Sequence, residues 1–337
     1  MIPRTVPTWQ IKSWQEELKE LIQDPQTLIE RLQLGAEWLE AAERANRQFP
    51  LRLTESYLSR IRPGDPHDPL LLQVLPIAAE LDTTPGYGKD PLDEARFNPV
   101  PGLVHKYRSR VLLIAATQCA INCRYCFRRH FPYEDNQLSR PEWLQALDYI
   151  RHAPEVNEVI LSGGDPLSLS DKQLAWLVQQ IADIGHIKRL RIHSRYPIIL
   201  PSRTTPELVD AITHPRLRTL MVMHCNHPQE IDAEVAKGVT ALTNSGISVL
   251  NQSVLLKNIN DNSRILATLS ENLFDINVQP YYLHLLDRVE GAAHFAVSDT
   301  DAKALYGELL TLLPGYLVPK LVRETPHEGS KTPVSPL

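Results

Sequence analysis

The stretch Cys119-Ala-Ile-Asn-Cys123-Arg-Tyr-Cys126-Phe-Arg-Arg-His-Phe131 determines how the rest of the chain is interpreted. Its three cysteines have the spacing C-x3-C-x2-C, and they follow an apolar run, Val111–Ala116, that is typical of a buried β-strand. The cysteines are therefore expected in a loop at the carboxyl end of a strand. Three thiolates so close together can hold a metal ion or an iron–sulfur cluster.

The number of cysteines favours one of these two kinds of site. A four-iron cluster takes four ligands, so three cysteines leave one iron open to a small molecule. A structural zinc site normally takes a fourth Cys or His, and the remaining cysteine, Cys225, lies far along the chain and is expected to be a buried thiol. The spacing therefore favours a cluster with one open iron. A non-catalytic iron–sulfur or zinc protein is the alternative.

Length, charge and cysteine usage restrict the class of protein. A chain of 337 residues can bury one large core or two smaller ones. A net charge of -5 argues against a protein that coats nucleic acid or a membrane surface, and neither a membrane-spanning run nor a signal-peptide core is expected. Four cysteines, three of them clustered, do not form a disulfide framework. A reducing cytoplasm is the expected location.

From residue 111 onward, strand patterns alternate with helix patterns, which predicts a parallel sheet. The predicted helices have clear starts, such as the capping boxes at Ser139 and Ser170. Because the cysteine loop follows the first strand, and barrel chemistry collects at the carboxyl ends of strands, we predict a partial (β/α)6 barrel of TIM type. A doubly wound open sheet is the competing topology. The predicted strands are Val111–Thr117, Glu158–Ser162, Arg189–Ser194, Thr219–His224, Ile247–Val254 and Asn277–Leu286.

Three regions are expected around this pattern. Residues 1–100 are predicted to form a helical extension and linker, with helix starts at Asp24-Pro25 and Asp68-Pro69. Residues 101–297 are predicted to form the barrel. Residues 298–337 are predicted to form a helix, which begins at Ser298, and a tail that lies over the barrel mouth.

Two polar segments follow predicted strands. Paired glycines in Ser162-Gly163-Gly164-Asp165 let the backbone approach a ligand, and the adjacent acid can receive an ammonium group; an ordinary turn is the alternative. Gln252 stands between Asn251 and Ser253 on the fifth strand, where polar side chains could bond a nucleoside or could simply be satisfied core groups.

Charged residues outside these segments could form a second half of the site. Lys331 has small neighbours, Gly329 and Ser330, as a lysine that binds a cofactor covalently would require, although a solvated lysine is the alternative. Lys106, Arg108 and Arg110 could hold a phosphate or form an exposed basic face.

Acids and arginines could select the substrate. Asp287 and Glu324 would favour a cationic substrate end if they meet in a pocket. Arg128 and Arg129 could bind a carboxylate through two nitrogens, or they could pair with structural acids.

Together these segments resemble the lysine 2,3-aminomutase family, radical S-adenosylmethionine (SAM) enzymes that also use pyridoxal phosphate (PLP). Similar segments run from about Pro101 to Pro336. The sequences of Phe127–Tyr133 and Gly291–Phe295 look most like those of bacterial members that prepare (R)-β-lysine for elongation factor P. The resemblance implies conversion of L-lysine to β-lysine with a [4Fe–4S] cluster, SAM and PLP. It also implies an electron donor, a functional link to elongation factor P and its lysyl ligase, and leaves a homo-oligomer possible. An aminomutase for another amino acid is the close alternative.

The resemblance also assigns residues. The cluster ligands correspond to Cys119, Cys123 and Cys126. The SAM contacts correspond to Ser162, Gly163, Gly164, Asp165 and Gln252. The PLP site corresponds to the Schiff-base residue Lys331 with Lys106, Tyr107 and Arg110. The substrate contacts correspond to Arg128, Asp287 and Glu324. Two positions depart from the clostridial-type pattern, since Glu324 stands for an aspartate and Lys106 for an arginine.

Overall fold

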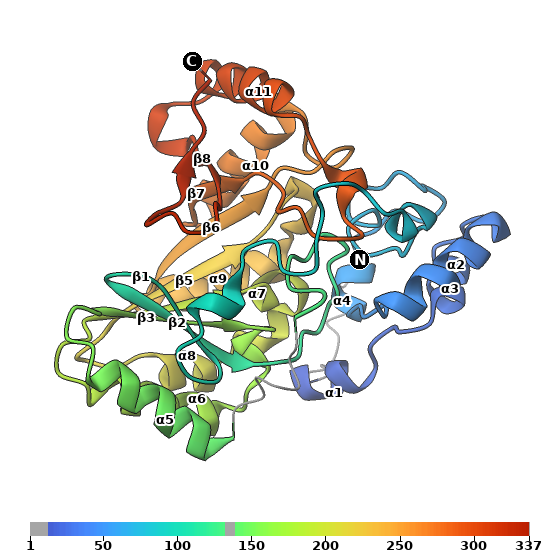
Figure 1. Ribbon diagram of the computed structural model, residues 1–337. Helices are drawn as coiled ribbons and strands as arrows, with labels where there is room; N and C mark the ends of the chain where they lie inside the picture. Colours follow the sequence, from blue (N-terminus) through green and yellow to red (C-terminus); the bar gives the residue numbers. More distant parts are fainter. Residues whose placement is uncertain (1–12, 132–138, 337) are drawn as a thin grey trace.

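The computed structural model describes residues 13–131 and 139–336 (Figure 1). They form a nine-stranded sheet whose strands follow one another in sequence order. Strands β2 to β8 are parallel, and β1 and β9 add antiparallel edges. A doubly wound sheet would reverse its order partway, so the predicted partial barrel is confirmed. The strands are β1 Leu103–Tyr107, β2 Arg110–Ala116, β3 Glu158–Gly163, β4 Arg189–Ser194, β5 Arg218–His224, β6 Ser248–Val254, β7 Gln279–His284, β8 Lys320–Arg323 and β9 Thr332–Pro333.

Helices connect the parallel strands and cover the outside of the sheet, as α5 and α6 do in Figure 1. Their starts match the predicted caps: Ser170 Oγ accepts from the Gln173 backbone N–H at 3.3 Å, and Gln173 Oε1 accepts from the Ser170 N–H at 3.1 Å. Such reciprocal bonds satisfy groups that the first helical turn leaves unpaired. The connecting helices are α5 Arg140–Arg151, α6 Asp171–Ala182, α7 Tyr196–Ile199, α8 Pro206–Ile212, α9 Ala233–Asn244, α10 Ser263–Asp275 and α11 Asp299–Leu312.

Strands β1, β8 and β9 were not predicted. The tail after the last helix was predicted without strands, but β8 pairs in parallel with β7, and β9 returns antiparallel to β8. These strands have four and two residues, too few to show an alternating pattern. They bring the end of the chain back to the sheet, so that Glu324 and Lys331 lie at the barrel mouth.

The N-terminal region is helical only in part, and residues 1–12 of the predicted extension lie outside the described residues. Asp68 Oδ1 accepts from the N–H groups of Leu70 and Leu71, as the predicted cap requires, but residues 69–74 form turns. The predicted second helix start is therefore wrong. Pro76 disfavours a helical residue before it, and the Gln73 carbonyl accepts from the Arg124 N–H instead. The helices are α1 Trp14–Lys19, α2 Pro25–Arg31, α3 Leu39–Gln48 and α4 Glu55–Leu58.

The N-terminal helices share a hydrophobic core with the barrel. Leu28 and Leu71 belong to the same cluster of buried side chains as Leu113 and Leu161 of the first parallel strands. Arg60 also donates to the Ile198 carbonyl in α7 at 2.6 Å. The extension is therefore packed against the barrel, to the right of it in Figure 1.

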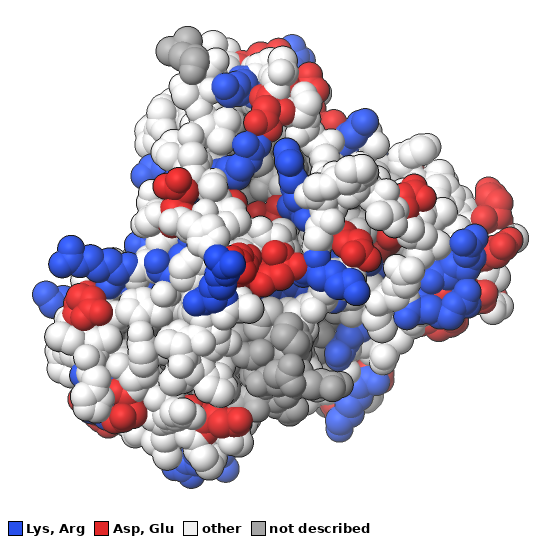
Figure 2. Space-filling model, viewed as in Figure 1, with Lys and Arg blue, Asp and Glu red and all other residues white. Residues whose placement is uncertain are grey.

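On the face shown in Figure 2, basic and acidic side chains are intermingled. Among the described residues, every helix is too short or too polar to cross a membrane.

Candidate active site

One cavity of about 700 Å³ lies at the carboxyl ends of the parallel strands. All of the residues that the resemblance assigns to the cluster, SAM, PLP or substrate line it, including Cys119 after β2 and Lys331 before β9. Arg108 is exposed at the turn between β1 and β2 and does not line the cavity. The structure thus brings together residues from positions 106 to 331, and their individual roles stay predictions.

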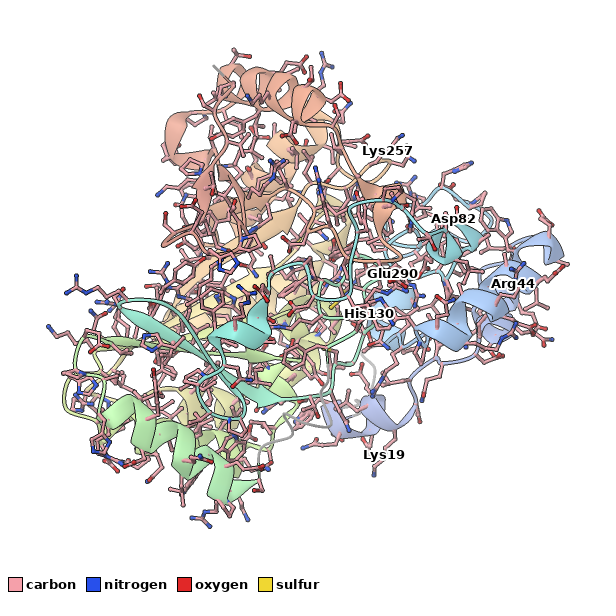
Figure 3. The ribbon with its side chains drawn as sticks, viewed as in Figure 1. Lys19, Arg44, Asp82, His130, Lys257 and Glu290 are labelled. Atoms are coloured by element: carbon pink, nitrogen blue, oxygen red, sulfur yellow. The ribbon has the colours of Figure 1, made fainter. Side chains whose placement is uncertain are left out.

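The cysteine loop is held by buried ion pairs. Arg124 donates to both oxygens of Glu80 at 2.8 and 2.6 Å, and Arg129 donates to the same carboxylate at 2.8 Å. Arg129 is therefore paired with a structural acid, one of the two alternatives for this residue. His130, at the end of the loop, lies beside Glu290 (Figure 3), with Nε2 at 3.3 Å from the Glu290 carbonyl. These contacts fix the loop between the N-terminal extension and the segment after β7.

The three cysteine thiols line the same cavity. A four-iron cluster takes each thiolate on a different iron. Burial raises the pKa of Cys119 and raises that of Cys126 to about 11. Iron would hold these thiols as thiolates, because a coordinating thiol loses its proton. Arg195 Nη1 already donates to Cys123 Sγ at 2.7 Å.

The paired glycines join β3 to the cysteine loop. A Cβ atom on Gly163, whose φ is +115°, would lie 2.4 Å from the Ala116 carbonyl, and one on Gly164 would lie 2.6 Å from that of Gln118. Only glycine allows this approach. The two glycines therefore bring the end of β3 against the loop as well as lining the cavity.

Asp165 is held by the protein itself. Its carboxylate accepts from Ser194 Oγ at 2.8 Å and from the Arg195 N–H at 2.7 Å. Burial raises the pKa of Asp165 to about 6, although these hydrogen bonds act in the opposite direction. The carboxylate thus anchors the end of β4 while it lines the cavity.

The polar residues of β6 have different surroundings. Asn251 Oδ1 accepts from the Cys225 N–H at 2.9 Å, and Ser253 Oγ donates to the Cys225 carbonyl at 2.7 Å. These two side chains are satisfied core groups, and Cys225 is fully buried as expected. Gln252, between them, lines the cavity, where its amide can meet a ligand.

The Glu324 carboxylate accepts hydrogen bonds from two lysines and a tyrosine. Lys331 Nζ donates to Glu324 Oε2 at 2.6 Å, and Lys106 Nζ donates to Oε1 at 2.7 Å. Tyr107 OH also donates to Oε1. Burial alone would raise the pKa of Glu324, but Lys331, Lys106 and Tyr107 together lower it to about 2. Glu324, which the resemblance assigns to the substrate, therefore contacts Lys331, Lys106 and Tyr107, which the resemblance assigns to PLP.

The residues around Lys331 fit PLP. Arg110 stacks on the Tyr107 ring at 4.1 Å, lines the cavity, and has no acidic partner in the described part of the chain, so it can receive a phosphate. The Lys331 amine lies 5.6 Å from the centre of the Tyr282 ring. A cation, flat rings and an amine at one end of the cavity match the phosphate, the ring and the aldehyde of this cofactor.

The residues predicted to bind the substrate differ in whether they form ion pairs within the protein. Arg128 donates through Nε and Nη2 to both oxygens of Glu94, at 2.9 and 2.7 Å, so the arginine that the resemblance assigns to the substrate carboxylate is paired with an acid of the linker. Asp287 forms no ion pair within residues 13–131 and 139–336. Burial raises its pKa to about 7, although Lys331 opposes that shift.

Several cavity residues were not predicted. His193, His224 and His284 occur near the carboxyl ends of β4, β5 and β7, and burial lowers the pKa of each, to about 3 for His224. Their place at strand ends could have revealed them. Glu94 gave no signal, because it lies in a linker rich in proline and glycine.

Comparison with known proteins agrees with this geometry. Residues 113–268 match the model of the radical SAM superfamily. The chain is 49% identical to an L-lysine 2,3-aminomutase of Escherichia coli K12, over 98% of this chain and 96% of the relative. It is 46% identical to the Haemophilus influenzae protein of the same name, over 95% of each chain. The Clostridium subterminale protein of that name is 36% identical over 96% of this chain and 78% of its own length. The chain therefore belongs to the L-lysine 2,3-aminomutase family of the radical SAM superfamily.

Proposed function

We propose that this protein moves the amino group of L-lysine from C2 to C3 and forms (R)-β-lysine, using a [4Fe–4S] cluster on Cys119, Cys123 and Cys126, SAM, and PLP on Lys331. The observation that carries the proposal is the shared cavity of Lys331 and the three thiols. When bound, the cluster supplies an electron to SAM, and PLP supplies the conjugated ring through which the amino group can migrate.

The protein holds the lysine by both ends. Arg128 would bind the α-carboxylate through two parallel hydrogen bonds, in exchange for Glu94. Asp287, which has no ion pair in the described parts of the chain, would receive the side-chain ammonium, and Glu324 would add a second negative charge. Contacts at both ends fix the position of C3 relative to the cluster, and such positioning lowers the barrier of the reaction.

The cavity also limits side reactions. It is lined by buried side chains such as Ile160 and Tyr125, and three of its histidines are kept neutral by burial. Apolar and neutral side chains at these positions limit the access of water to reactive intermediates. The two acids at one end disfavour a substrate with an anionic side chain.

We further propose that the product serves the modification of elongation factor P by a lysyl ligase, and that an external electron donor reduces the cluster in a reducing cytoplasm. The resemblance in Phe127–Tyr133 and Gly291–Phe295 supports the first of these. All four cysteines are free thiols, which agrees with the second. Free lysine is the proposed substrate.

Product analysis tests this function. Anaerobic protein loaded with iron, sulfide and PLP is incubated with SAM, dithionite and either free L-lysine, free L-arginine or lysylated elongation factor P, and the products are separated by chiral chromatography and mass spectrometry. (R)-β-lysine from free lysine is expected. Fully loaded protein that forms no β-amino acid from lysine would refute the proposal, and preferential turnover of arginine or of the lysylated factor would reassign the substrate.

A further inference from the structure

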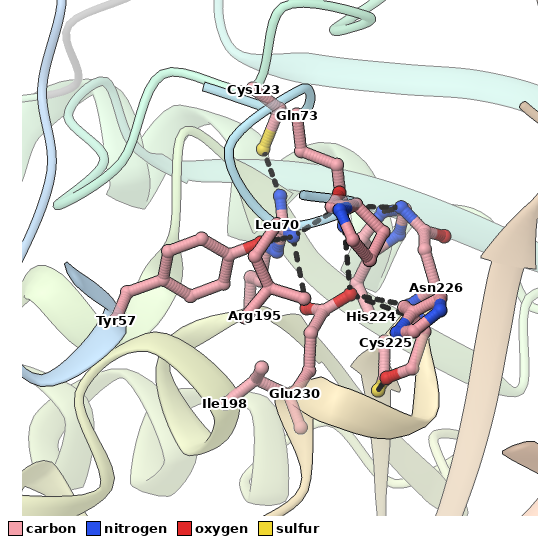
Figure 4. A network of polar contacts seen from close by, with 12 residues as sticks. Tyr57, Leu70, Gln73, Cys123, Arg195, Ile198, His224, Cys225, Asn226 and Glu230 are labelled. Carbon is pink, nitrogen blue, oxygen red and sulfur yellow. Dashed lines mark hydrogen bonds and ion pairs between the residues drawn. The ribbon is translucent and has the colours of Figure 1, made fainter. Parts of the chain in front are cut away.

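The guanidinium of Arg195 connects a cluster cysteine to a buried polar network. Arg195 follows β4, and its Nη1 donates to Cys123 Sγ at 2.7 Å (Figure 4). Its Nη2 donates to Gln73 Oε1 at 2.7 Å and to Glu230 Oε2 at 3.0 Å. A positive charge is thus held directly against one proposed ligand of the cluster.

This charge is fixed in place. Arg195 is 6% exposed and Glu230 is fully buried. Glu230 Oε1 accepts from the backbone N–H groups of Asn226 and His227, at 3.0 and 3.1 Å. Burial alone would raise the pKa of Glu230, but Arg195 and these donors lower it below its ordinary value. Both members of the pair therefore stay charged and cannot turn to solvent.

One N–H group of the guanidinium is left without an acceptor in the described part of the chain. Arg195 Nε is buried and has no hydrogen-bond acceptor in the described part of the chain. Its other two nitrogens are engaged by Cys123, Tyr57, Gln73 and Glu230. Buried donors are nearly always satisfied, and a cluster on Cys123 would bring sulfide acceptors to this part of the cavity.

Charges and hydrogen bonds at the sulfurs set the reduction potential of an iron–sulfur cluster. Reduction adds one electron from an external donor and makes the cluster more negative by one unit, so a nearby cation stabilises the reduced form and a nearby anion destabilises it. Low dielectric strengthens both effects.

We propose that Arg195 is a positioning residue that raises the reduction potential of the cluster through Cys123, and that Glu230 moderates this effect from the opposite side of the guanidinium. The inference rests on the proposed function, since it requires the cluster on Cys123. Arg195, at the end of β4, would thus influence electron transfer to SAM and would take no part in the binding of lysine or PLP.

A purely structural role makes a different prediction. If Arg195 and Glu230 only stabilise the fold, removal of either would lower the iron content without moving the potential of the cluster that remains. The proposal instead predicts shifts of opposite sign. Arg203 provides the matched control, because it is fully buried and paired with Asp171 at 2.7 Å but does not line the cavity.

The experiment compares the reconstituted full-length protein with its Arg195→Gln, Glu230→Gln and Arg203→Gln variants. Iron and sulfide are assayed, and the reduced cluster is followed by electron paramagnetic resonance at a series of fixed potentials without SAM. For Arg195→Gln we expect about a tenfold fall in the ratio of reduced to oxidised cluster at a given potential, which corresponds to about 59 mV for one electron. Glu230→Gln should shift the ratio upward, and Arg203→Gln should leave it unchanged.

Unchanged potentials, or shifts of the same sign in the Arg195 and Glu230 variants, would overturn the inference. If Arg195→Gln holds no cluster, the Arg195→Lys and Glu230→Gln variants decide. Arg195→Lys keeps the positive charge but loses the planar guanidinium, so its ratio of reduced to oxidised cluster should fall by a smaller factor. The ratio for Glu230→Gln should still rise. Wild-type protein without a four-iron cluster would instead refute the proposed function.

Discussion

Lys331 Nζ lies 2.6 Å from Glu324 Oε2, so the proposed PLP lysine is ion-paired with a proposed substrate acid. Lys106 is bound to the other oxygen of the same carboxylate. PLP on Lys331 would occupy this amine, and Glu324 would then have an oxygen available for the ammonium of the substrate. The two sites are thereby linked through one carboxylate.

Replacement of Glu324 by Gln should weaken lysine binding more than PLP binding. The change removes the negative charge but leaves Arg110 to hold the phosphate, so we expect KM for lysine to rise about tenfold or more, as for the loss of a hydrogen bond to a charged group. PLP absorbance should persist. Glu328→Gln, at an exposed acid nearby, is the control, and equal effects of both variants would contradict the assignment.

The pH dependence of lysine use should follow Asp287. Burial raises the pKa of Asp287 to about 7, and only the ionised carboxylate attracts an ammonium group. We therefore expect kcat/KM for lysine to level off above pH 7 and to fall about tenfold per pH unit below it. Steady-state kinetics from pH 5.5 to 8.5 would measure this. Asp287→Asn should have lower activity and lack this limb of the profile; a variant that retains the limb would assign it to another group.

The contact between Arg128 and Glu94 should compete with the substrate. Because Glu94 occupies two nitrogens of Arg128, its conversion to Gln should lower KM for lysine several-fold. Arg128→Lys keeps the charge but loses the two-pronged contact, so KM should rise by about tenfold or more. Glu155→Gln, at an exposed site, should change neither. A higher KM in Glu94→Gln would show that Glu94 orients the arginine instead of competing for it.

Loss of the Glu80 carboxylate should destabilise the fold. Glu80 is paired with Arg124 and Arg129, and all three side chains are almost fully buried. Glu80→Gln leaves two buried cations without their anion, a change that costs about 3–5 kcal/mol. Urea unfolding of the reduced, iron-free protein measures the loss, with Glu37→Gln, at an exposed acid, as the control. A free energy of unfolding equal to that of the control would contradict this account of the cysteine loop.

Most of the fold could be predicted from the sequence, because the strand patterns and helix caps occur in the same order as the strands in the sheet. The strands that follow the cysteine loop alternate with capped helices, and the predicted capping box at Ser170 begins α6. The strands β8 and β9 were missed because they are too short for a pattern and depend on pairing with β7. The turns at 69–74 were mistaken for a helix because the partner of Gln73 is an arginine far away in the sequence.

The candidate site was also predictable in its lining but not in its internal contacts. Residues at the carboxyl ends of parallel strands must converge, so Cys119, Gly163 and Asp287 could be placed together before the structure was known. No local pattern links Glu94 to Arg128 or Arg195 to Cys123. These contacts arise only when the linker, β4 and the cysteine loop pack at one end of the barrel.

The central claim is that Lys331, at the end of the chain, binds PLP in the cavity of the cysteine loop. Borohydride reduction of the PLP-loaded protein, followed by peptide mapping, tests it directly. The account predicts a pyridoxyl group on the peptide that contains Lys331, and for Lys331→Ala the loss of this label and of aminomutase activity with the iron content retained. A label on Lys106 or another lysine, or full activity in Lys331→Ala, would contradict it.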